Sequence, residues 1–196
     1  RNTGTLIKFS PDPQYFDTIK FSIKKLRHNL RSKAVLCPGL EVNFANEIDE
    51  TTDKWLFEDG IKDYLQASLD GLDCIPAIPF VISSKSKEEQ LDCALTWTEN
   101  TTNTTAESFV NLIPTIGGGT HVNGLRSGLT DALKEFCEFR SLIPKNIKLT
   151  PDDVWQNIAF VLSIKILDPQ FSGQTKERLS SRECASFVSG VVKDSF

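Results

Sequence analysis

The stretch Ile158-Ala159-Phe160-Val161-Leu162-Ser163-Ile164-Lys165-Ile166-Leu167 decides the fold class of this chain. Its first half is almost wholly apolar, and an apolar run of this length between polar segments is typical of a buried strand. A strand that presents no polar face lies inside a sheet rather than at its edge. We therefore expect residues 158–167 to form the central strand around which the other elements pack.

Further strands and helices are predicted before and after this central strand. Three more stretches have the apolar pattern of strands, at 80–84, 91–98 and 107–113. Helical spacing of apolar residues predicts a short helix at 61–69 and a long helix after Gly117-Gly118-Gly119. Thr150-Pro151 is typical of a helix start, and Ser180-x-x-Glu183 resembles a capping box that opens a last helix. Because several strands are adjacent in sequence, we expect an α+β domain with an antiparallel or mixed sheet and helices packed on one face.

The first sixty residues have a different pattern. Residues 5–9 alternate in polarity, which predicts a strand that ends at Pro11-Asp12-Pro13. Apolar side chains at helical spacing predict a helix at 15–36, and the residues after it predict a hairpin with strands at 40–46 and 54–58.

Composition limits the function classes that need to be considered. The chain has 196 residues, 39% of them hydrophobic and 24% charged, which predicts one ordinary globular domain and excludes collagen-like, coiled-coil and disordered classes. Its five cysteines include no C-x-x-C pair, which disfavours a zinc site or a disulfide scaffold and favours the reducing cytoplasm. No apolar run is long enough to span a membrane. The chain contains no methionine, even at position 1, so we interpret it as a fragment or a processed product.

The net charge of −4 conceals a separation of basic and acidic segments. Residues 20–33 contain six Lys or Arg and no acid, whereas residues 41–73 contain ten acids. Four of the basic residues repeat at helical spacing and share one face: Lys20, Lys24, Arg27 and Arg31. This face could be the solvated flank of an amphipathic helix, or it could make sequence-independent, salt-sensitive contacts with a polyanion.

Two further segments are candidates for contact with phosphate. The run Gly117-Gly118-Gly119 precedes a predicted helix, where free backbone N–H groups can hold an anion, but a triple glycine is equally suited to a flexible turn. Gln174-Thr175-Lys176 lies in a predicted loop, where a lysine can reach a phosphate or remain solvated. His28 and His121 have no partner at ligand spacing, so no metal site is expected.

Several motifs, distributed from one end of the chain to the other, resemble the B subunits of bacterial type IIA topoisomerases. The segments that carry the resemblance are Gly4-Thr5 to Phe9, Leu30-Arg31-x-Lys33-Ala34, Val110-Asn111-Leu112-Ile113-Pro114-Thr115, Gly118-Gly119-Thr120-His121-Val122-Asn123-Gly124-Leu125-Arg126, and Asp168-Pro169-Gln170-Phe171 through Gln174-Thr175-Lys176-Glu177-Arg178-Leu179. Within the family, residues 121–126 and the tail 184–190 are more similar to the topoisomerase IV branch than to the gyrase branch.

The resemblance implies a transducer domain with a ribosomal protein S5 domain 2-like fold and a left-handed β-α-β crossover. Residues 1–10 would be the exit strand from a preceding ATP-binding domain of the GHKL type, and residues 11–196 would be the transducer itself. In the family, the Gln and Lys of the Q-T-K motif contact the γ-phosphate of ATP, so the resemblance implies that Gln174 and Lys176 bind nucleotide and that Lys176 acts in hydrolysis. ATP and Mg²⁺ would bind the full-length protein, and neither is expected on this chain alone.

The resemblance also implies partners. They are a second B subunit that closes an ATP-dependent gate, the topoisomerase IV A subunit, and double-stranded DNA, for which Lys20, Lys24, Arg27 and Arg31 are candidate contacts. The implied activity is the DNA isomerase reaction of chromosome segregation in the cytoplasm, with no membrane involved. Three alternatives remain: the equivalent domain of the gyrase B subunit, an S5-like DNA-binding or scaffold module without a nucleotide role, and a transducer of the MutL mismatch-repair type.

Overall fold

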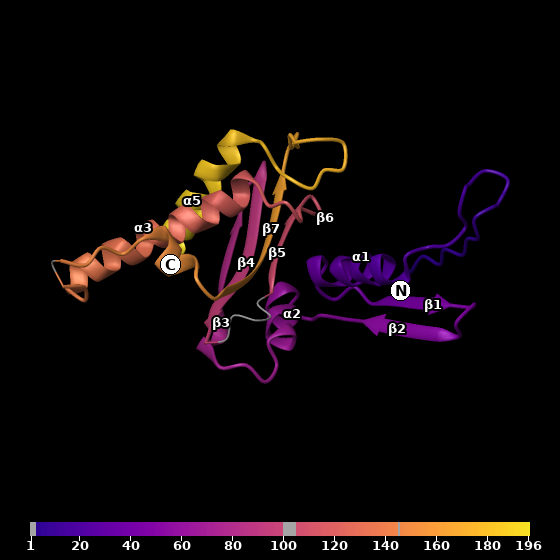
Figure 1. Cartoon of the computed structure of the whole chain (residues 1–196), viewed down its shortest axis with the longest axis horizontal. Helices are drawn as coiled ribbons and strands as arrows, with labels where there is room; N and C mark the ends of the chain where they lie inside the picture. The colour runs from indigo at the N-terminus through magenta and orange to yellow at the C-terminus, as the bar shows by residue number, and fades with distance from the viewer. Residues whose placement is uncertain (1–2, 100–104, 145) are drawn as a thin grey trace.

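The computed structural model describes residues 3–99, 105–144 and 146–196, and its centre is a five-stranded mixed sheet (Figure 1). The strands are β3 (Cys74–Lys85), β4 (Glu89–Thr98), β5 (Ala106–Val110), β6 (Ile113–Pro114) and β7 (Ile158–Ile166). Their order across the sheet is β3-β4-β7-β5-β6. Strand β7 pairs antiparallel with β4 and parallel with β5, which confirms both the α+β class and the central position predicted for this strand. The linker at 100–105, polar and turn-prone in sequence, falls almost entirely outside the described residues.

One face of the sheet is covered by two long helices that lie side by side, α3 (Thr120–Arg140) and α5 (Arg182–Ser195) (Figure 1). A Cβ on Gly124 would lie 2.5 Å from the carbonyl oxygen of Ala185, and one on Gly128 would lie 2.7 Å from that of Ser189. The contacts advance in the same direction along both helices, so the pair is parallel. Glycine at these two positions lets the backbones touch and makes the helix pair a tightly packed unit.

The opposite face of the sheet is also covered, which corrects the expectation that helices pack on one face only. The short helix α2 (Ile61–Ser68) lies there, with Tyr64 and Leu65 buried against Ala94 of β4 and Val161 of β7. The physical reason is the composition of β7: its residues are apolar on both faces, so each face must be removed from water.

The N-terminal region forms a separate arm, residues 3–58, that projects from this sheet body (Figure 1). It contains α1 (Ile23–Leu36) and a two-stranded antiparallel sheet of β1 (Val42–Asn46) and β2 (Thr51–Trp55). The predicted hairpin is confirmed with shifted ends, but the helix begins at Ile23 instead of residue 15. Ser22 ends the non-helical segment, because its side chain accepts a hydrogen bond from the backbone N–H of Lys25 and so caps the helix. Residues 5–9 form no strand within this chain, and Leu6 is 94% exposed.

Two predicted helix starts have different outcomes. Thr150 caps α4 (Pro151–Trp155) and Pro151 opens it, as expected, and a capping box with Asp153 is formed in addition. The predicted box of Ser180 and Glu183 is not formed, because α5 starts one residue later and the hydroxyl of its N-cap, Ser181, accepts a hydrogen bond from the backbone N–H of Gln170. None of the helices in the described parts of the chain is both long and apolar enough to cross a membrane.

Candidate functional site: an exposed Q-T-K loop packed on a glycine run

The loop that follows β7 turns back on itself and carries the Q-T-K motif at its tip. Phe171 and Leu179 form an antiparallel bridge at its base, and the N–H of Ser172 donates to the carbonyl oxygen of Arg178 at 2.9 Å. Gly173 at φ +90° and Lys176 at φ +58° make the reversals that close the tip. The loop is therefore a closed turn with a defined base.

Gln174 and Lys176 are both exposed at the tip of this turn. The Nζ atom of Lys176 lies 6.0 Å from the centroid of the Phe171 ring, an aromatic contact that is compatible with a free ammonium group. Within residues 3–99, 105–144 and 146–196, neither side chain forms an ion pair or a side-chain hydrogen bond. The turn thus displays one cation, which can attract a phosphate as a point charge, and one amide, which can donate a directed hydrogen bond to a phosphate oxygen.

The glycine run 117–119 contacts the base of this turn. The N–H of Gly117 donates to the carbonyl oxygen of Glu177 at 2.9 Å, and the N–H of Gly118 donates to that of Thr115 at 2.9 Å. The N–H of Thr120, the first residue of α3, donates to the carbonyl oxygen of Leu179 at 3.2 Å. Because these N–H groups already have acceptors, the hypothesis that the run cradles a phosphate is not supported.

A buried polar network lies behind the glycine run. The imidazole Nε2 of His121 lies 3.0 Å from the hydroxyl oxygen of Thr115, which lies 2.7 Å from the hydroxyl oxygen of Ser108. His121 is fully buried, and burial lowers its pKa from 6.5 to about 4, so the ring is neutral at pH 7. Its Nδ1 atom has no hydrogen-bond partner among the described residues. His121 is consequently a core residue and not a candidate acid or base.

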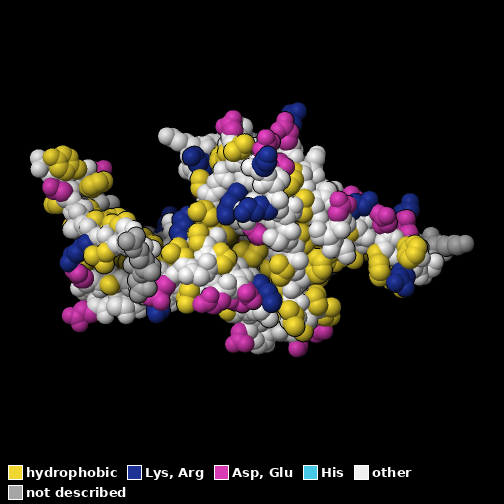
Figure 2. Space-filling model, turned by 180° about the vertical axis from the view of Figure 1, so that it is seen from behind, with side chains coloured by type: hydrophobic (Ala, Val, Ile, Leu, Met, Phe, Trp, Pro, Cys, Tyr) yellow, Lys and Arg dark blue, Asp and Glu magenta, His cyan; other side chains and the backbone are white. Residues whose placement is uncertain are grey.

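The basic face predicted in the arm divides into two pairs. Lys24 lies exposed on α1, and Lys20 is exposed but precedes the helix, so the expected helical alignment of all four cations is wrong for Lys20. Arg27 donates from Nε to a carboxylate oxygen of Asp53 at 2.6 Å, and the guanidinium of Arg31 lies 4.6 Å from the centroid of the Tyr64 ring. Of these four cations, only Lys20 and Lys24 have neither an ion pair nor an aromatic contact among the described residues. Figure 2 shows acidic and basic side chains interspersed over both body and arm.

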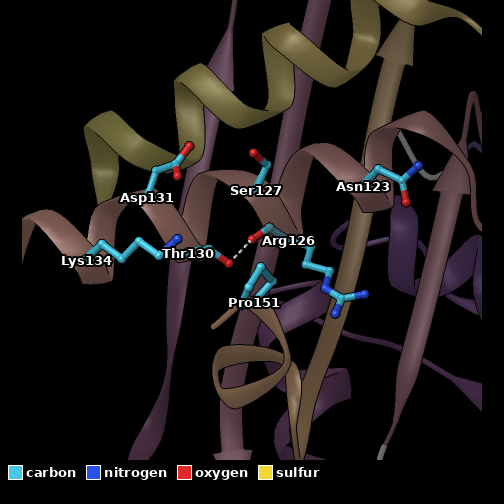
Figure 3. Close-up of a pocket in the computed structure, with 7 residues that line it drawn as sticks. All are labelled: Asn123, Arg126, Ser127, Thr130, Asp131, Lys134 and Pro151. Carbon is cyan, nitrogen blue, oxygen red and sulfur yellow. Dashed lines mark hydrogen bonds between the residues drawn. The ribbon is translucent and has the colours of Figure 1, made fainter. Parts of the chain in front are cut away.

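An open groove of about 310 Å³ runs along α3 beside α4 (Figure 3). It is lined by Asn123, Arg126, Ser127, Thr130, Asp131, Lys134 and Pro151. Arg126 forms an ion pair with Asp152 and lies 5.8 Å from the centroid of the Trp155 ring, so it holds α4 against α3. Among the residues that the structure describes, no group of three His, Cys, Asp or Glu side chains could hold a metal ion.

Comparison with known proteins assigns the chain to a family. The family model described as DNA gyrase B matches residues 60–196. The chain belongs to this family. The B subunit of DNA topoisomerase 4 from Haemophilus influenzae is 55% identical over 196 residues, which are 100% of this chain and 31% of that protein. The Escherichia coli protein of the same description is 53% identical over the same shares.

Solved structures support the same assignment. The topoisomerase IV ATP binding domain of Francisella tularensis superposes with a TM-score of 0.78 at 43% identity, covering 94% of this chain and 49% of that one. The 43K ATPase domain of Thermus thermophilus gyrase B has the same TM-score at 28% identity, covering 94% and 50%. The predicted recognition, a transducer fragment of the topoisomerase IV type in the gyrase B family, is confirmed. The chain spans about a third of the length of its curated relatives.

Sequence reasoning missed two contributors to the site. Arg178 donates from Nη1 to the carbonyl oxygen of Gly117 at 2.9 Å, and Gly119 forms a parallel bridge with Leu179. The triple glycine was the sequence signal for them: it indicates that another backbone segment comes close, but it does not show which segment that is.

Proposed function

We propose that this chain is the transducer domain of the B subunit of an ATP-dependent type IIA topoisomerase. In this proposal Gln174 and Lys176 contact the γ-phosphate of ATP bound to a preceding GHKL domain, and the loss of that contact on hydrolysis releases the domain. The cycle would couple ATP to closure of a gate formed with a second B subunit, and to passage of double-stranded DNA with the topoisomerase IV A subunit in the cytoplasm.

The observation that carries the proposal is the presentation of Lys176. Its ammonium group stands exposed at the tip of a turn whose base is tied to buried backbone at Leu179, a residue that is 1% exposed. A cation held on a firm base can be aimed at charge that develops during phosphoryl transfer without reorganising. Gln174 beside it supplies an amide that can donate to a phosphate oxygen.

The finer details of the fold are part of the same proposal. We infer an S5 domain 2-like fold in which the connection from β5 through α3 to β7 is the left-handed crossover. The parallel pairing of β5 with β7 requires a crossover connection, and its left hand is what the resemblance implies. Residues 1–10 would be the exit strand from the ATP-binding domain, with residues 11–196 as the transducer. The exposed Leu6 and Ile7 are compatible with a partner for that segment outside this chain.

The decisive test is Lys176→Ala in the intact B subunit. We expect ATP turnover to fall by about 100-fold, because removal of one preorganised charge contact to the transition state typically costs a factor of this size. Lys87→Ala is the matched control, since Lys87 is an exposed lysine in the turn between β3 and β4, outside the loop. Wild-type turnover in Lys176→Ala would refute the nucleotide role and favour the scaffold alternative.

The chain alone is expected to hydrolyse no ATP. In this proposal Lys176 supplies charge, whereas the Mg²⁺ ligands and the catalytic base belong to the preceding GHKL domain. The measurement is steady-state phosphate release by the purified chain with MgATP. Turnover that survives purification and is lost in Lys176→Ala would contradict this division of labour.

We also propose that the arm contributes to DNA capture through its unengaged lysines. Charge reversal at both sites, Lys20→Glu with Lys24→Glu, should weaken DNA capture by the intact enzyme and reduce its salt dependence, since each lost phosphate contact lowers the slope of log K against log salt by about one. Lys87→Glu is the control. An unchanged slope in the double variant would remove DNA contact from the function of the arm.

The gyrase alternative predicts the same chemistry with a different partner. Assembly of the intact protein with a topoisomerase IV A subunit should produce relaxation and decatenation of DNA. Negative supercoiling with a gyrase A subunit would instead favour the gyrase branch.

A further inference from the structure

We propose that Gly119 and Arg178 are positioning residues for Lys176: they dock the Q-T-K turn onto the backbone in front of α3 and thereby set the place of its ammonium group. This inference rests on the proposed nucleotide role of Lys176. It assigns the triple glycine a task that is neither phosphate binding nor flexibility.

The docking is made of main-chain contacts between segments about sixty residues apart. The N–H of Gly117 donates to the carbonyl oxygen of Glu177 at 2.9 Å, and the N–H of Leu179 donates to the carbonyl oxygen of Gly118 at 3.0 Å. The N–H of Thr120 adds a third bond, to the carbonyl oxygen of Leu179. These bonds form a short parallel ladder that ends three residues after Lys176.

Gly119 is required by the closeness of this ladder. A Cβ on Gly119 would lie 2.3 Å from the carbonyl oxygen and 2.6 Å from the amide nitrogen of Leu179. Its φ of +137° is in addition a backbone conformation that L side chains rarely adopt. Because the obstructing atoms are backbone, no side-chain rotation can relieve the clash, and a larger residue must push the turn away.

Arg178 adds a contact from the turn itself. Its Nη1 donates to the carbonyl oxygen of Gly117, and its side chain is exposed, so truncation would remove the bond without leaving a cavity. Arg178 lies two residues after Lys176 in the sequence, so the bond restrains the part of the turn that bears the lysine.

The backbone contact between residues 117–120 and residues 177–179 also links the turn to the helix pair. Thr120 is both a donor to the turn and the first residue of α3, and α3 is packed backbone to backbone on α5 at Gly124 and Gly128. A displacement of the turn therefore acts directly on the N-terminus of a stiff two-helix unit. A pull on Lys176 would reach these helices through the hydrogen bond of Thr120, since the other two bonds of the ladder end at Gly117 and Gly118, ahead of α3.

The test compares Gly119→Ala with Gly71→Ala in the intact B subunit. Gly71 has φ +79° and nothing within 4 Å of its added Cβ, so the control carries backbone strain without moving the loop. We expect the kcat for ATP to fall by about 10- to 100-fold in Gly119→Ala, with a KM change below about threefold, since misplacing a reacting group by about 1 Å costs on this scale. Gly71→Ala should retain the wild-type kcat.

Arg178 supplies a milder variant that does not threaten folding. Arg178→Ala should lower kcat by about two- to tenfold, as expected for one hydrogen bond, and Arg178→Lys should recover part of the loss. In each variant, amide hydrogen exchange of residues 117–120 and 177–180 should accelerate, while exchange in β7 should not.

Non-additivity distinguishes positioning from general damage. In a Lys176→Ala background, Gly119→Ala should cause no further loss of kcat, because there is no ammonium group left to misplace. An additional tenfold loss in the double variant would overturn the inference, as would wild-type turnover in Gly119→Ala while Lys176→Ala is impaired. Wild-type turnover in Lys176→Ala itself would instead overturn the proposed function, and the positioning role with it.

Discussion

The sheet body and the N-terminal arm contain the same kinds of side chain, but they differ in how far apolar side chains are buried and in which cations are paired. In the body, apolar residues of β7 such as Val161 and Leu162 are 0% exposed, and Lys176 is left free on a rigid base. In the arm, Leu6 and Ile48 are more than 90% exposed, while Arg27 is held by an ion pair. The family model begins at residue 60, where the body begins. The body therefore presents its lysine from a turn tied to buried backbone, whereas the unpaired lysines of the arm, Lys20 and Lys24, lie in a region with few internal contacts.

The arm is attached to the body over a short junction. The last turn of α1 is buried at Ala34, Val35 and Leu36, and the guanidinium of Arg31 stacks on the Tyr64 ring of α2. Beyond this junction, the arm depends on its own hairpin. Four tests of this contrast follow, in decreasing order of the expected change in stability.

Truncation of a core side chain should produce the largest difference in unfolding free energy between the two regions. Leu162→Ala in β7 should lower the free energy of unfolding by about 3 kcal/mol, because it leaves a cavity in a closely packed core. Leu30→Ala in α1 removes a half-buried side chain and should cost about 1 kcal/mol or less. Urea unfolding of the chain measures both. Equal losses would mean that the arm is as tightly packed as the body.

Acid should destabilise the body through His121. Burial lowers its pKa from 6.5 to about 4, so between these values the unfolded chain binds a proton that the folded chain does not. The contribution to stability is therefore complete above pH 6.5 and is lost as the pH falls toward 4, by up to about 3 kcal/mol.

His121→Gln should flatten that pH dependence, measured as unfolding free energy at pH 7, 5.5 and 4.5. Thr115→Val is the matched control, because it removes the hydroxyl beside the imidazole and leaves the titrating group in place. The same slope in wild type and His121→Gln would exclude His121 as its source.

The helix α2, on which the arm docks, should respond to loss of a single hydroxyl. Tyr64 donates to a carboxylate oxygen of Glu107 at 2.5 Å, and burial together with this bond raises its pKa. Tyr64→Phe should cost about 1 kcal/mol, since it leaves the carboxylate without its donor. Glu107→Gln keeps an acceptor and should cost less. No change in the unfolding free energy of Tyr64→Phe would show that this bond does not stabilise the packing of α2 on the sheet.

The smallest effect is expected within the arm. Asp53→Asn removes the charge that pairs with Arg27, but both side chains are about one-third exposed, so the loss should be about 0.5 kcal/mol or less and should shrink in high salt. Hydrogen exchange of β1 and β2 measures it locally. An effect on exchange in the sheet body would show that the arm is coupled to the body more closely than its contacts indicate.

Much of the fold could be predicted because its signals are local. The apolar run at 158–167 predicted the central strand, Thr150 with Pro151 predicted a helix start, and the hairpin was placed within a few residues. The long helix at 15–36 was predicted too early, because helical spacing continues past Ser22, where the capping bond interrupts the helix.

The candidate site was predictable only as a pair of motifs. Gln174 and Lys176 were singled out by residue type and by resemblance, but nothing local distinguishes a free lysine from one in an ion pair, as the basic residues of α1 illustrate. Arg27 and Asp53 are 26 residues apart in sequence, and only the folded hairpin brings them into contact.

The α+β class, the central strand and the family could be predicted before the structure was known, because apolar periodicity, capping residues and motif spacing are local properties of the chain. Tertiary structure decided that both faces of the sheet are covered, which cations remain free and what the triple glycine does. The run 117–119 and the turn at 177–179 pair through backbone atoms, which are the same in every residue and leave no side-chain signature except the absence of a Cβ. That absence shows in a sequence as a glycine, but its partner appears only when the chain has folded.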